Sequence, residues 1–260
     1  MIKLAAFDVD GTLRDRDHLP ASTRSAVKRL KESGVIPVLC TGRSEYEIAS
    51  LREELGMDWA ITCNGSHIGY QGKTMFGTPF GKEKVVAWLQ EAERSNHALL
   101  LYGSEFMYTN RANDPLFLRA REEIGFLEPR LLDLSGGTEA LPEFYQSIIF
   151  CEELQEGLYT GGNAEEFYIH RWRPWAVDLN PRGMNKAIGL KKLLEHLTIA
   201  PEEAAAFGDG LNDMELLAAV GTGIAMGNAI EELKGVARHV TRSLHEDGIA
   251  YAVDTWILPG

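Results

Sequence analysis

The pattern of hydrophobic and polar positions changes twice along this 260-residue chain. Near the N-terminus, short apolar runs alternate with amphipathic helical patterns, which is typical of a buried parallel sheet covered by helices. The pattern predicts strands at 4–9, 35–41 and 59–64, one helix at 22–33 and another that ends before Gly56. Ser44 and Glu47 form a Ser-x-x-Glu capping box at the start of this second helix. This succession predicts a parallel sheet with right-handed crossovers.

The alternation of strands and helices is weaker in the middle of the chain. The sequence predicts a β-hairpin at 68–76, a helix at 82–95 and a strand at 98–102. From 103 to 162 the pattern is irregular, with one helix predicted near 115–124 and one strand near 145–150. Two further short strands are predicted within 167–179. Such a region indicates a separate inserted unit of the α+β kind.

Regular alternation resumes at Asn185 and continues to the C-terminal end. The predicted elements are a helix at 185–196, a strand at 204–207, a short helix at 212–219, a strand at 223–226, a helix at 230–237, a strand at 239–241 and a final helix at 248–256. We therefore expect an α/β fold whose core is discontinuous in sequence. The core comprises residues 1–80 and 183–260, and residues 81–182 form the inserted α+β unit.

Two carboxylates follow the first predicted strand. Asp8 and Asp10 flank Val9 at the carboxyl end of that strand, and Gly11 comes next. In open α/β sheets this edge is where ligands bind. Two anions held so close need a counter-charge, which a divalent metal with oxygen ligands supplies. Since Asp-Gly is also a common turn dipeptide, this motif alone fits a plain turn equally well.

A second motif, Thr41-Gly42-Arg43, lies where the second predicted strand leads into the capped helix. A hydroxyl group and free backbone N–H groups at a helix N-terminus bind phosphate oxygens well. Lys186 lies just inside the start of another predicted helix, where a cation opposes the helix dipole unless an anion is near. The unfavourable position of the Lys186 cation at a helix start favours a functional role for this residue. The Thr41-Gly42-Arg43 motif, taken alone, fits an ordinary strand-to-helix loop equally well.

The third carboxylate motif is Gly208-Asp209-Gly210-Leu211-Asn212-Asp213, after another predicted strand. The spacing of four between Asp209 and Asp213 would place both carboxylates on one face of a helix. Alternatively, Asn212 and Asp213 cap the short helix that follows. Taken together, the three motifs and Lys186 supply the parts that metal-assisted phosphoryl transfer requires.

Composition limits the classes of partner. Lys and Arg total 26 against 38 Asp and Glu, which gives a formal net charge of −12 and disfavours general nucleic-acid binding. The negative net charge is still compatible with a small anionic substrate, because a metal ion and a few basic residues can reverse the electrostatic field inside one cleft. The widely spaced Cys40, Cys63 and Cys151 are expected to pack as small apolar residues. Without a signal-peptide core or a long apolar stretch, we expect a soluble cytoplasmic protein with no membrane partner.

These motifs together resemble those of a phosphatase of the haloacid dehalogenase-like (HAD) superfamily, of the Cof type. The matching segments are 8–12, 41–43, Lys186 and 208–213, supported by Asn64-Gly65, Asn228 and 246–250. The resemblance covers both core segments and is weak in the middle. It implies a Rossmann-like, doubly wound parallel sheet with an inserted α+β cap domain between the second and third motifs.

The resemblance also implies a role for each motif residue. Asp8 would be the nucleophile, and Asp10 the general acid and then the general base. Thr41 and Lys186 would hold the transferring phosphoryl group. The implied substrate-binding residues are Thr41, Gly42, Arg43, Lys186 and Asn212. Mg²⁺ would be held by Asp8, the Asp10 backbone carbonyl and Asp209, with Asn212 or Asp213 assisting.

The expected substrate is a small phosphorylated metabolite such as a sugar phosphate, pyridoxal phosphate or flavin mononucleotide. The oligomeric state is not predicted. The cap is rich in aromatic residues, most of which we expect in its core. The run from His170 to Arg173 is expected to form a solvated face, with recognition of a leaving group as the alternative. His67 departs from the family pattern and is expected to be a solvated loop residue.

Other protein classes share parts of this pattern. A signalling receiver domain also carries an acceptor Asp, a Thr and a Lys, but is about half this length and has no cap. Phosphosugar mutases on the same scaffold carry their main insertion soon after the first motif, where this chain has only 13–20 before its first helix. An ion-pump domain has Lys-Thr after the nucleophile. A catalytically inactive scaffold would lack a motif residue, and this chain has all of them.

Overall fold

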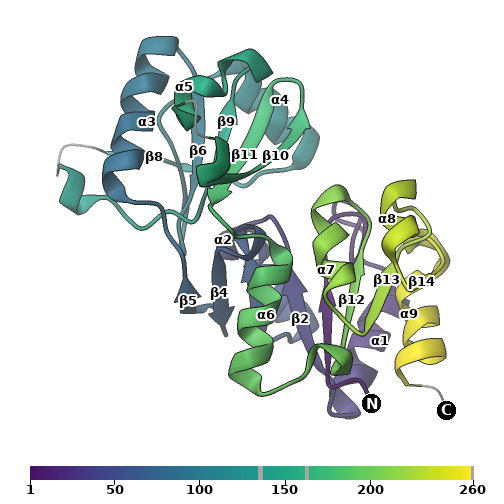
Figure 1. The fold of residues 1–260 in the computed structure, drawn as a ribbon. Helices are drawn as coiled ribbons and strands as arrows, with labels where there is room; N and C mark the ends of the chain where they lie inside the picture. The colour runs from purple at the N-terminus through teal and green to yellow at the C-terminus, as the bar shows by residue number, and fades with distance from the viewer. Residues whose placement is uncertain (134–136, 162–163, 259–260) are drawn as a thin grey trace.

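The strands of the chain form two separate sheets (Figure 1). The computed structural model describes residues 1–133, 137–161 and 164–258. One sheet is built from strands near both ends of the chain, and the other from strands in the middle. The strand pairing therefore groups the two ends of the chain in one sheet and its middle in another.

The first sheet has eight strands in the order β14-β13-β12-β1-β2-β3-β4-β5. The strands are β1 (Leu4–Phe7), β2 (Ile36–Cys40), β3 (Trp59–Thr62), β4 (His67–Tyr70), β5 (Lys73–Gly77), β12 (Ala204–Gly208), β13 (Thr222–Ala225) and β14 (His239–Val240). Neighbouring strands from β14 to β3 are parallel, whereas β4 and β5 form an antiparallel hairpin at the edge. The predicted parallel sheet and hairpin are confirmed.

Helices pack on this sheet because its central strands are apolar on both faces. Every residue of β1 and β12 is buried, and the rings of Phe7 and Phe207 stack at 4.7 Å between them. The helices are α1 (Ala21–Glu32), α2 (Glu45–Leu55), α6 (Lys186–Leu197), α7 (Met214–Ala218), α8 (Glu231–Val236) and α9 (Gly248–Ala252). α1 contacts α2 and α9, while α7 contacts α6 and α8, so the helices form two groups. This is the predicted doubly wound arrangement.

The second sheet has six strands in the order β10-β11-β9-β6-β7-β8. They are β6 (Ala98–Tyr102), β7 (Met107–Thr109), β8 (Arg130–Leu131), β9 (Gln146–Phe150), β10 (Phe167–Arg173) and β11 (Ala176–Pro181). The pairs are antiparallel except for β7 with β8. The helices of this region are α3 (Lys82–Ser95), α4 (Pro115–Ile124) and α5 (Gly157–Thr160).

The two faces of the second sheet have different neighbours. Leu99, Ile149 and Val177 point to one face, where they pack with Trp88 of α3 in a hydrophobic cluster. Successive side chains of a strand alternate between faces, so the adjacent positions point the other way. That opposite face carries Gln146, His170 and Asp178, and it lines a cleft shared with the first sheet. Polar residues inside otherwise apolar strands therefore mark the face of this sheet that lines the cleft.

Several local expectations differ from the structure. The stretch from 103 to 162 was expected to hold one helix and one strand, but β7, β8 and α5 also form there. These elements are two to four residues long, too short for a periodic pattern. Residues 134–136 and 162 of that stretch lie outside the described residues. The final helix is α-helical only to Ala252 and continues as a π-helical turn to Ile257.

Candidate active site

The carboxyl ends of β1 and β12 and the start of α6 bring three charged side chains together. Asp8 follows β1, Lys186 is the first residue of α6, and Asp213 ends the short helical turn after β12. Lys186 Nζ donates to Asp8 Oδ1 at 2.6 Å and to Asp213 Oδ1 at 2.7 Å. The Lys186 side chain is only 1% exposed. The conflict predicted at this helix start is thus resolved by two buried anions.

Asp209 lies beside the same group and is held from the first motif. Its Oδ1 accepts a hydrogen bond of 2.8 Å from the Thr12 hydroxyl. Gly11 has a φ of +84°, and a Cβ atom there would come within 2.2 Å of Asp209 Oδ2. Position 11 therefore requires glycine for two reasons: its backbone is left-handed, and the Asp209 carboxylate leaves no space for a side chain.

Asp213 shapes the loop that carries Asp209. Its Oδ2 accepts from the backbone N–H groups of Asp209 and Gly210, at 3.0 and 3.1 Å. Asp213 occupies the N-cap position of α7, as the alternative expected, but its side chain bonds back to the Gly210 N–H instead of to α7. The expectation that a helix places Asp209 and Asp213 on one face is wrong, because Asp209 precedes the helical turn that begins at Leu211. The two residues are instead joined across a tight loop.

The carboxylates strongly affect one another's protonation. Burial raises the pKa of Asp8, Lys186 opposes this, and the charges of Asp213 and Asp209 raise it further. The pKa of Asp209 is raised to about 6, first by burial and then by Asp213, although the Thr12 hydrogen bond opposes the shift. For Lys186, burial alone would lower the pKa, but the two carboxylates raise it overall. The lysine is therefore firmly cationic, while the acids favour a further positive charge.

The donor set suits a hard divalent cation. One carboxylate oxygen from each of Asp8, Asp209 and Asp213 lies within 4.8 Å of the others. Oxygen ligands are those that Mg²⁺ prefers, and the raised pKa values of Asp8 and Asp209 mean that a nearby cation would favour their ionised forms. The geometry and chemistry of these residues therefore fit the implied metal.

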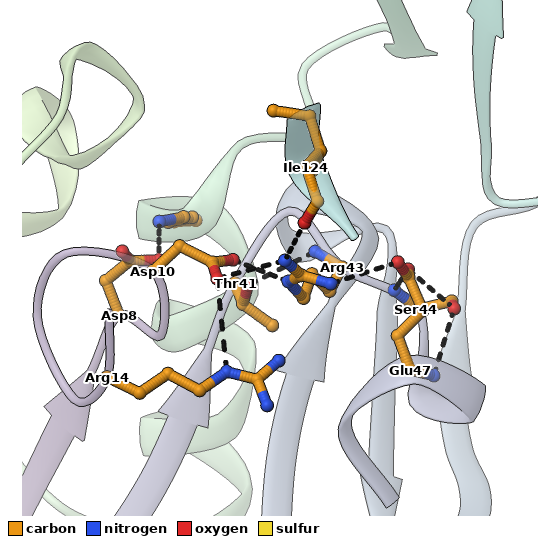
Figure 2. A network of polar contacts seen from close by, with 9 residues as sticks. Asp8, Asp10, Arg14, Thr41, Arg43, Ser44, Glu47 and Ile124 are labelled. Atoms are coloured by element: carbon orange, nitrogen blue, oxygen red, sulfur yellow. Dashed lines mark hydrogen bonds and ion pairs between the residues drawn. The ribbon is translucent and has the colours of Figure 1, made fainter. Parts of the chain in front are cut away.

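Asp10 and Arg43 form a second network at the carboxyl ends of β1 and β2 (Figure 2). Arg43 Nε donates to Asp10 Oδ2 at 2.5 Å, and Nη2 donates to Asp10 Oδ1 at 3.0 Å. Behind the guanidinium, Nη1 contacts the buried Glu47, which also completes the confirmed capping box with Ser44. Nη2 also reaches the backbone oxygen of Ile124 at the end of α4, at 3.1 Å. One arginine thus connects Asp10 to the middle region of the chain.

Thr41 is buried at the base of this network. Its hydroxyl oxygen accepts from the backbone N–H of Arg43 at 3.1 Å, which fixes its direction. Burial lowers the pKa of Arg43, but the Asp10 and Glu47 carboxylates raise it overall. The Arg43 guanidinium is therefore held as a cation where it lines the cleft.

A cleft of about 400 Å³ lies between the two sheets at this edge. From the first sheet's loops it is lined by Asp8, Asp10, Thr41, Gly42, Arg43, Asp209 and Asn212, among others. From the middle region it is lined by Tyr102, Phe126, Gln146, Ile148, His170, Trp172, Arg173 and Asp178, among others. All of the residues expected at the site gather here, with Lys186 and Asp213 buried beneath the surface of the cleft.

Asn64 connects the two sides of the cleft. It is 1% exposed, adopts a left-handed φ of 50°, and accepts a hydrogen bond from Asn212 Nδ2 at 3.1 Å. Its own Nδ2 donates to Gln146 Oε1, also at 3.1 Å. The sequence showed Asn64 as part of a supporting Asn-Gly motif but gave it no role. Gln146 and Asp178 were missed entirely, although each is a polar residue in an apolar strand.

Two expectations about particular side chains are corrected. His67 lies in β4 at 1% exposure, between the hydroxyls of Thr62 and Thr74, and is not a solvated loop residue. His170, Trp172 and Arg173 line the cleft, so the run at 170–173 is not simply a solvated face. All three cysteines are buried and free, as predicted.

Comparison with known proteins agrees with the fold and the motifs. A family model described as haloacid dehalogenase-like hydrolase matches residues 5–253, and the chain belongs to this family. The Bacillus subtilis (strain 168) protein YkrA, named as a candidate phosphatase, is 35% identical, with 96% of each chain covered. The HMP-PP phosphatase of Yersinia pestis (strain Pestoides F) is 30% identical, covering 99% of this chain and 96% of that protein.

Solved structures give the same result. A hypothetical protein from Geobacillus kaustophilus HTA426 superposes with a TM-score of 0.88 at 37% identity, with 98% of both chains covered. A sugar phosphatase of HAD subclass IIB superposes with a TM-score of 0.82 at 26% identity, covering 97% of this chain and 98% of that one. The resemblance inferred from the motifs is confirmed, and the chain is an enzyme of the phosphatase class.

Among the residues described, helices long and apolar enough to span a membrane are absent.

Proposed function

We propose that the chain is a Mg²⁺-dependent phosphatase that hydrolyses a small phosphorylated metabolite through a phosphoaspartate on Asp8. The observation that carries this proposal is the position of Asp8. Its carboxylate lines the cleft, contacts the Lys186 ammonium at 2.6 Å, and lies beside Asp209. A carboxylate attacks a phosphate ester slowly because both are anions, and the Lys186 cation, together with a metal bound by Asp8 and Asp209, would offset that repulsion. Candidate substrates are sugar phosphates, pyridoxal phosphate and flavin mononucleotide.

The residues that would hold the metal are Asp8, Asp209 and the backbone carbonyl of Asp10. Bound there, Mg²⁺ would neutralise charge on the transferring phosphoryl group. Asp213 has a different role in this proposal, because Lys186 and two backbone N–H groups occupy its oxygens. It holds the lysine and the loop in place, and Asn212 lines the cleft beside them.

The reaction on this chain proceeds in two displacements. Asp8 attacks phosphorus, the bond to the leaving oxygen breaks, and Asp10 donates a proton to that oxygen. Thr41 and the cationic Lys186 hold the phosphoryl oxygens. Asp10 then removes a proton from water, which attacks phosphorus, so that inorganic phosphate leaves and the Asp8 carboxylate is regenerated.

Arg43 controls when Asp10 can act. In the present arrangement both Asp10 oxygens accept hydrogen bonds from the guanidinium, which favours the ionised form of Asp10 and opposes its protonation. We propose that a bound phosphate ester attracts the Arg43 guanidinium and releases Asp10. A side chain at Gly42 would crowd Asn64, whose amide nitrogen and oxygen lie 3.2 Å from where a Cβ would be.

We also propose that residues 1–80 and 183–260 act as the catalytic core and 81–182 as a cap domain. The support is that the two sheets lie on either side of the cleft, with catalytic motifs on one side and aromatic and polar side chains on the other. A cap of this kind excludes water from the phosphoryl group and contacts the leaving group.

Replacement of Asp8 by asparagine tests the function. Asp8→Asn keeps the shape of the side chain but removes the nucleophile, so hydrolysis of p-nitrophenyl phosphate should fall by at least about a thousandfold. Asp15→Asn is a matched control, because Asp15 also lines the cleft but is exposed at its mouth. It should retain activity. A melting curve would confirm folding, and activity of Asp8→Asn within tenfold of the unmodified enzyme would contradict the assignment.

A further inference from the structure

The cap side of the cleft contains a buried carboxyl group without a cationic partner. Asp178 of β11 is 7% exposed, and its Oδ1 accepts a hydrogen bond of 2.8 Å from Trp172 Nε1. The other carboxylate on this wall, Glu123, forms ion pairs with Arg119 and Arg173. Among the described residues, the groups that contact the Asp178 carboxyl are neutral. Asp178 therefore differs from Glu123 in lacking a compensating charge.

The surroundings of Asp178 make its ionisation unfavourable in the free protein. Burial raises its pKa to about 7, and the hydrogen bonds from Trp172 and Asn64 only partly oppose this. The buried Glu47 carboxylate raises it further. A buried acid of this kind costs folding free energy unless a ligand provides the missing partner. Its position in the cleft rather than in a closed core means that a ligand can reach it.

The indole of Trp172 forms an aromatic wall of the cleft beside Asp178, with the Arg173 guanidinium 5.5 Å from its ring centroid. Trp172 packs edge-on against Phe126 at 6.2 Å and against Trp175 at 6.0 Å, so the indole is held from two sides. Its N–H group is directed at Asp178, which fixes the plane of the ring. Such a wall favours a ring in the leaving group over an extended chain.

Hydrogen-bonding groups beside this wall belong to the same surface. Gln146 is 1% exposed and is oriented by the hydrogen bond from Asn64. His170 lies directly opposite Asp178 in the pairing of β10 with β11, and burial lowers the pKa of its imidazole. With the imidazole neutral, His170 supplies no positive charge to balance an ionised Asp178.

We propose that Asp178, with Trp172 and Gln146, forms a leaving-group subsite for a single ring that carries an amino or hydroxyl donor. A cationic amine is preferred there, and a second anionic group is disfavoured. This inference rests on the proposed function and names the substrate class. An ammonium group meeting Asp178 gains a charge-assisted hydrogen bond in a poorly hydrated site, whereas a carboxylate would be repelled.

Two matched pairs of sugar phosphates test the proposal. Glucosamine 6-phosphate and glucose 6-phosphate differ by an amine in place of a hydroxyl. Glucuronic acid 1-phosphate and glucose 1-phosphate differ by a carboxylate in place of a hydroxymethyl group. We expect kcat/KM for glucosamine 6-phosphate to exceed that for glucose 6-phosphate by about tenfold or more, because its ammonium group would meet Asp178. We expect kcat/KM for glucuronic acid 1-phosphate to be about tenfold or more below that for glucose 1-phosphate, because its carboxylate would meet Asp178 instead.

Variants of Asp178 separate this effect from general loss of activity. Asp178→Asn should bring both ratios to within about threefold of unity, whereas Asp178→Glu, which keeps the carboxyl group, should retain the preference for the amine. Because each ratio compares two esters on the same variant, a general loss of activity, followed with p-nitrophenyl phosphate, cancels from it. If the unmodified enzyme shows no preference, or Asp178→Asn keeps it, the subsite proposal is wrong.

Binding of free sugars keeps this test independent of catalysis. Glucosamine should raise the unfolding midpoint of the unmodified protein more than glucose does, and Asp178→Asn should remove that difference. If no ester is hydrolysed but glucosamine still binds through Asp178, the proposed function fails and the subsite stands. If p-nitrophenyl phosphate is hydrolysed but neither turnover nor binding distinguishes the amine, only the subsite fails.

Discussion

Lys186 is 178 positions from Asp8 and 27 positions from Asp213 along the chain, yet its ammonium group lies between their carboxylates. Removing one partner from such a buried group typically costs about 3–5 kcal/mol, because an uncompensated charge stays behind. The sequence could indicate a functional role for Lys186, because a cation at the start of a helix is locally unfavourable. It could not show that both Asp213 oxygens are occupied, since that depends on the path of a loop.

The polar residues that line the cleft from the second sheet show a different limit of sequence reasoning. Gln146 and Asp178 carry no motif, and each lies in a strand of mainly apolar residues. Their position opposite the catalytic loops follows from the register of β9 and β11, which a single sequence does not fix. Asn64 was visible as part of a motif, but its bridging role requires both Asn212 and Gln146 to be in place.

Dependence on the metal is the first prediction at the residue scale. Activity on p-nitrophenyl phosphate should vanish with a chelator and return with Mg²⁺. Ca²⁺ should restore it poorly, because its larger and looser oxygen shell would misplace the reacting groups. Asp209→Asn should raise the Mg²⁺ concentration for half-maximal activity by about tenfold or more, since a charged ligand is lost.

The matched control for Asp209 is Asp15→Asn, which removes an exposed acid at the mouth of the same cleft. It should leave the Mg²⁺ dependence unchanged. Mg²⁺-induced stabilisation, followed by the shift of the unfolding midpoint, gives a readout that does not depend on turnover. Full activity in excess chelator would exclude the metal mechanism.

The elements fall into two groups by how well the sequence predicts them. α3 and α4 begin and end where their patterns predict, because α3 is long and amphipathic and α4 carries a capping Asp114 before a proline. The short strands β7 and β8 were missed, since two or three residues cannot show a period. The hairpin of β4 and β5 was predicted. The burial of His67 in this hairpin, against the ring of Tyr145, was not.

His67 provides a prediction about pH at the scale of this hairpin. Burial lowers its pKa from 6.5 to about 4. Between these values the unfolded chain binds a proton at His67 and the folded chain does not, so stability falls as pH decreases. The contribution is up to about 1.4 kcal/mol per pH unit. His67→Gln should therefore reduce the loss of unfolding free energy between pH 6.5 and 4, measured by urea denaturation at several pH values.

His18→Gln is the matched control for this experiment, because His18 is exposed near the mouth of the cleft and stacks on His245. It should keep the pH dependence of the unmodified protein. An identical slope for His67→Gln and the unmodified protein would mean that His67 titrates normally in the folded state.

The whole molecule assembles its cleft from segments that are distant in sequence. The loops that we propose to be catalytic follow β1, β2 and β12, and the opposite wall comes from β6, β9, β10 and β11. The fold class and every motif of the catalytic side could be predicted, because parallel strands bring their carboxyl ends to one edge. The opposite wall could not, because it depends on how the two sheets face one another. Figure 1 shows the two crossings of the chain that join them, after β5 and after β11.

The central claim is that Asp8 carries a phosphoryl group that Asp10 helps to hydrolyse. p-Nitrophenolate leaves without needing a proton, so Asp10→Asn should spare the first step and slow the second by about 10²–10⁴-fold. Rapid-quench measurement of Asp10→Asn with p-nitrophenyl phosphate should show a burst of about one p-nitrophenol per active site, then slow turnover, as phospho-Asp8 accumulates. Unchanged steady turnover of Asp10→Asn, or an unmodified enzyme that retains a long-lived phosphoaspartate and releases little phosphate, would contradict the account.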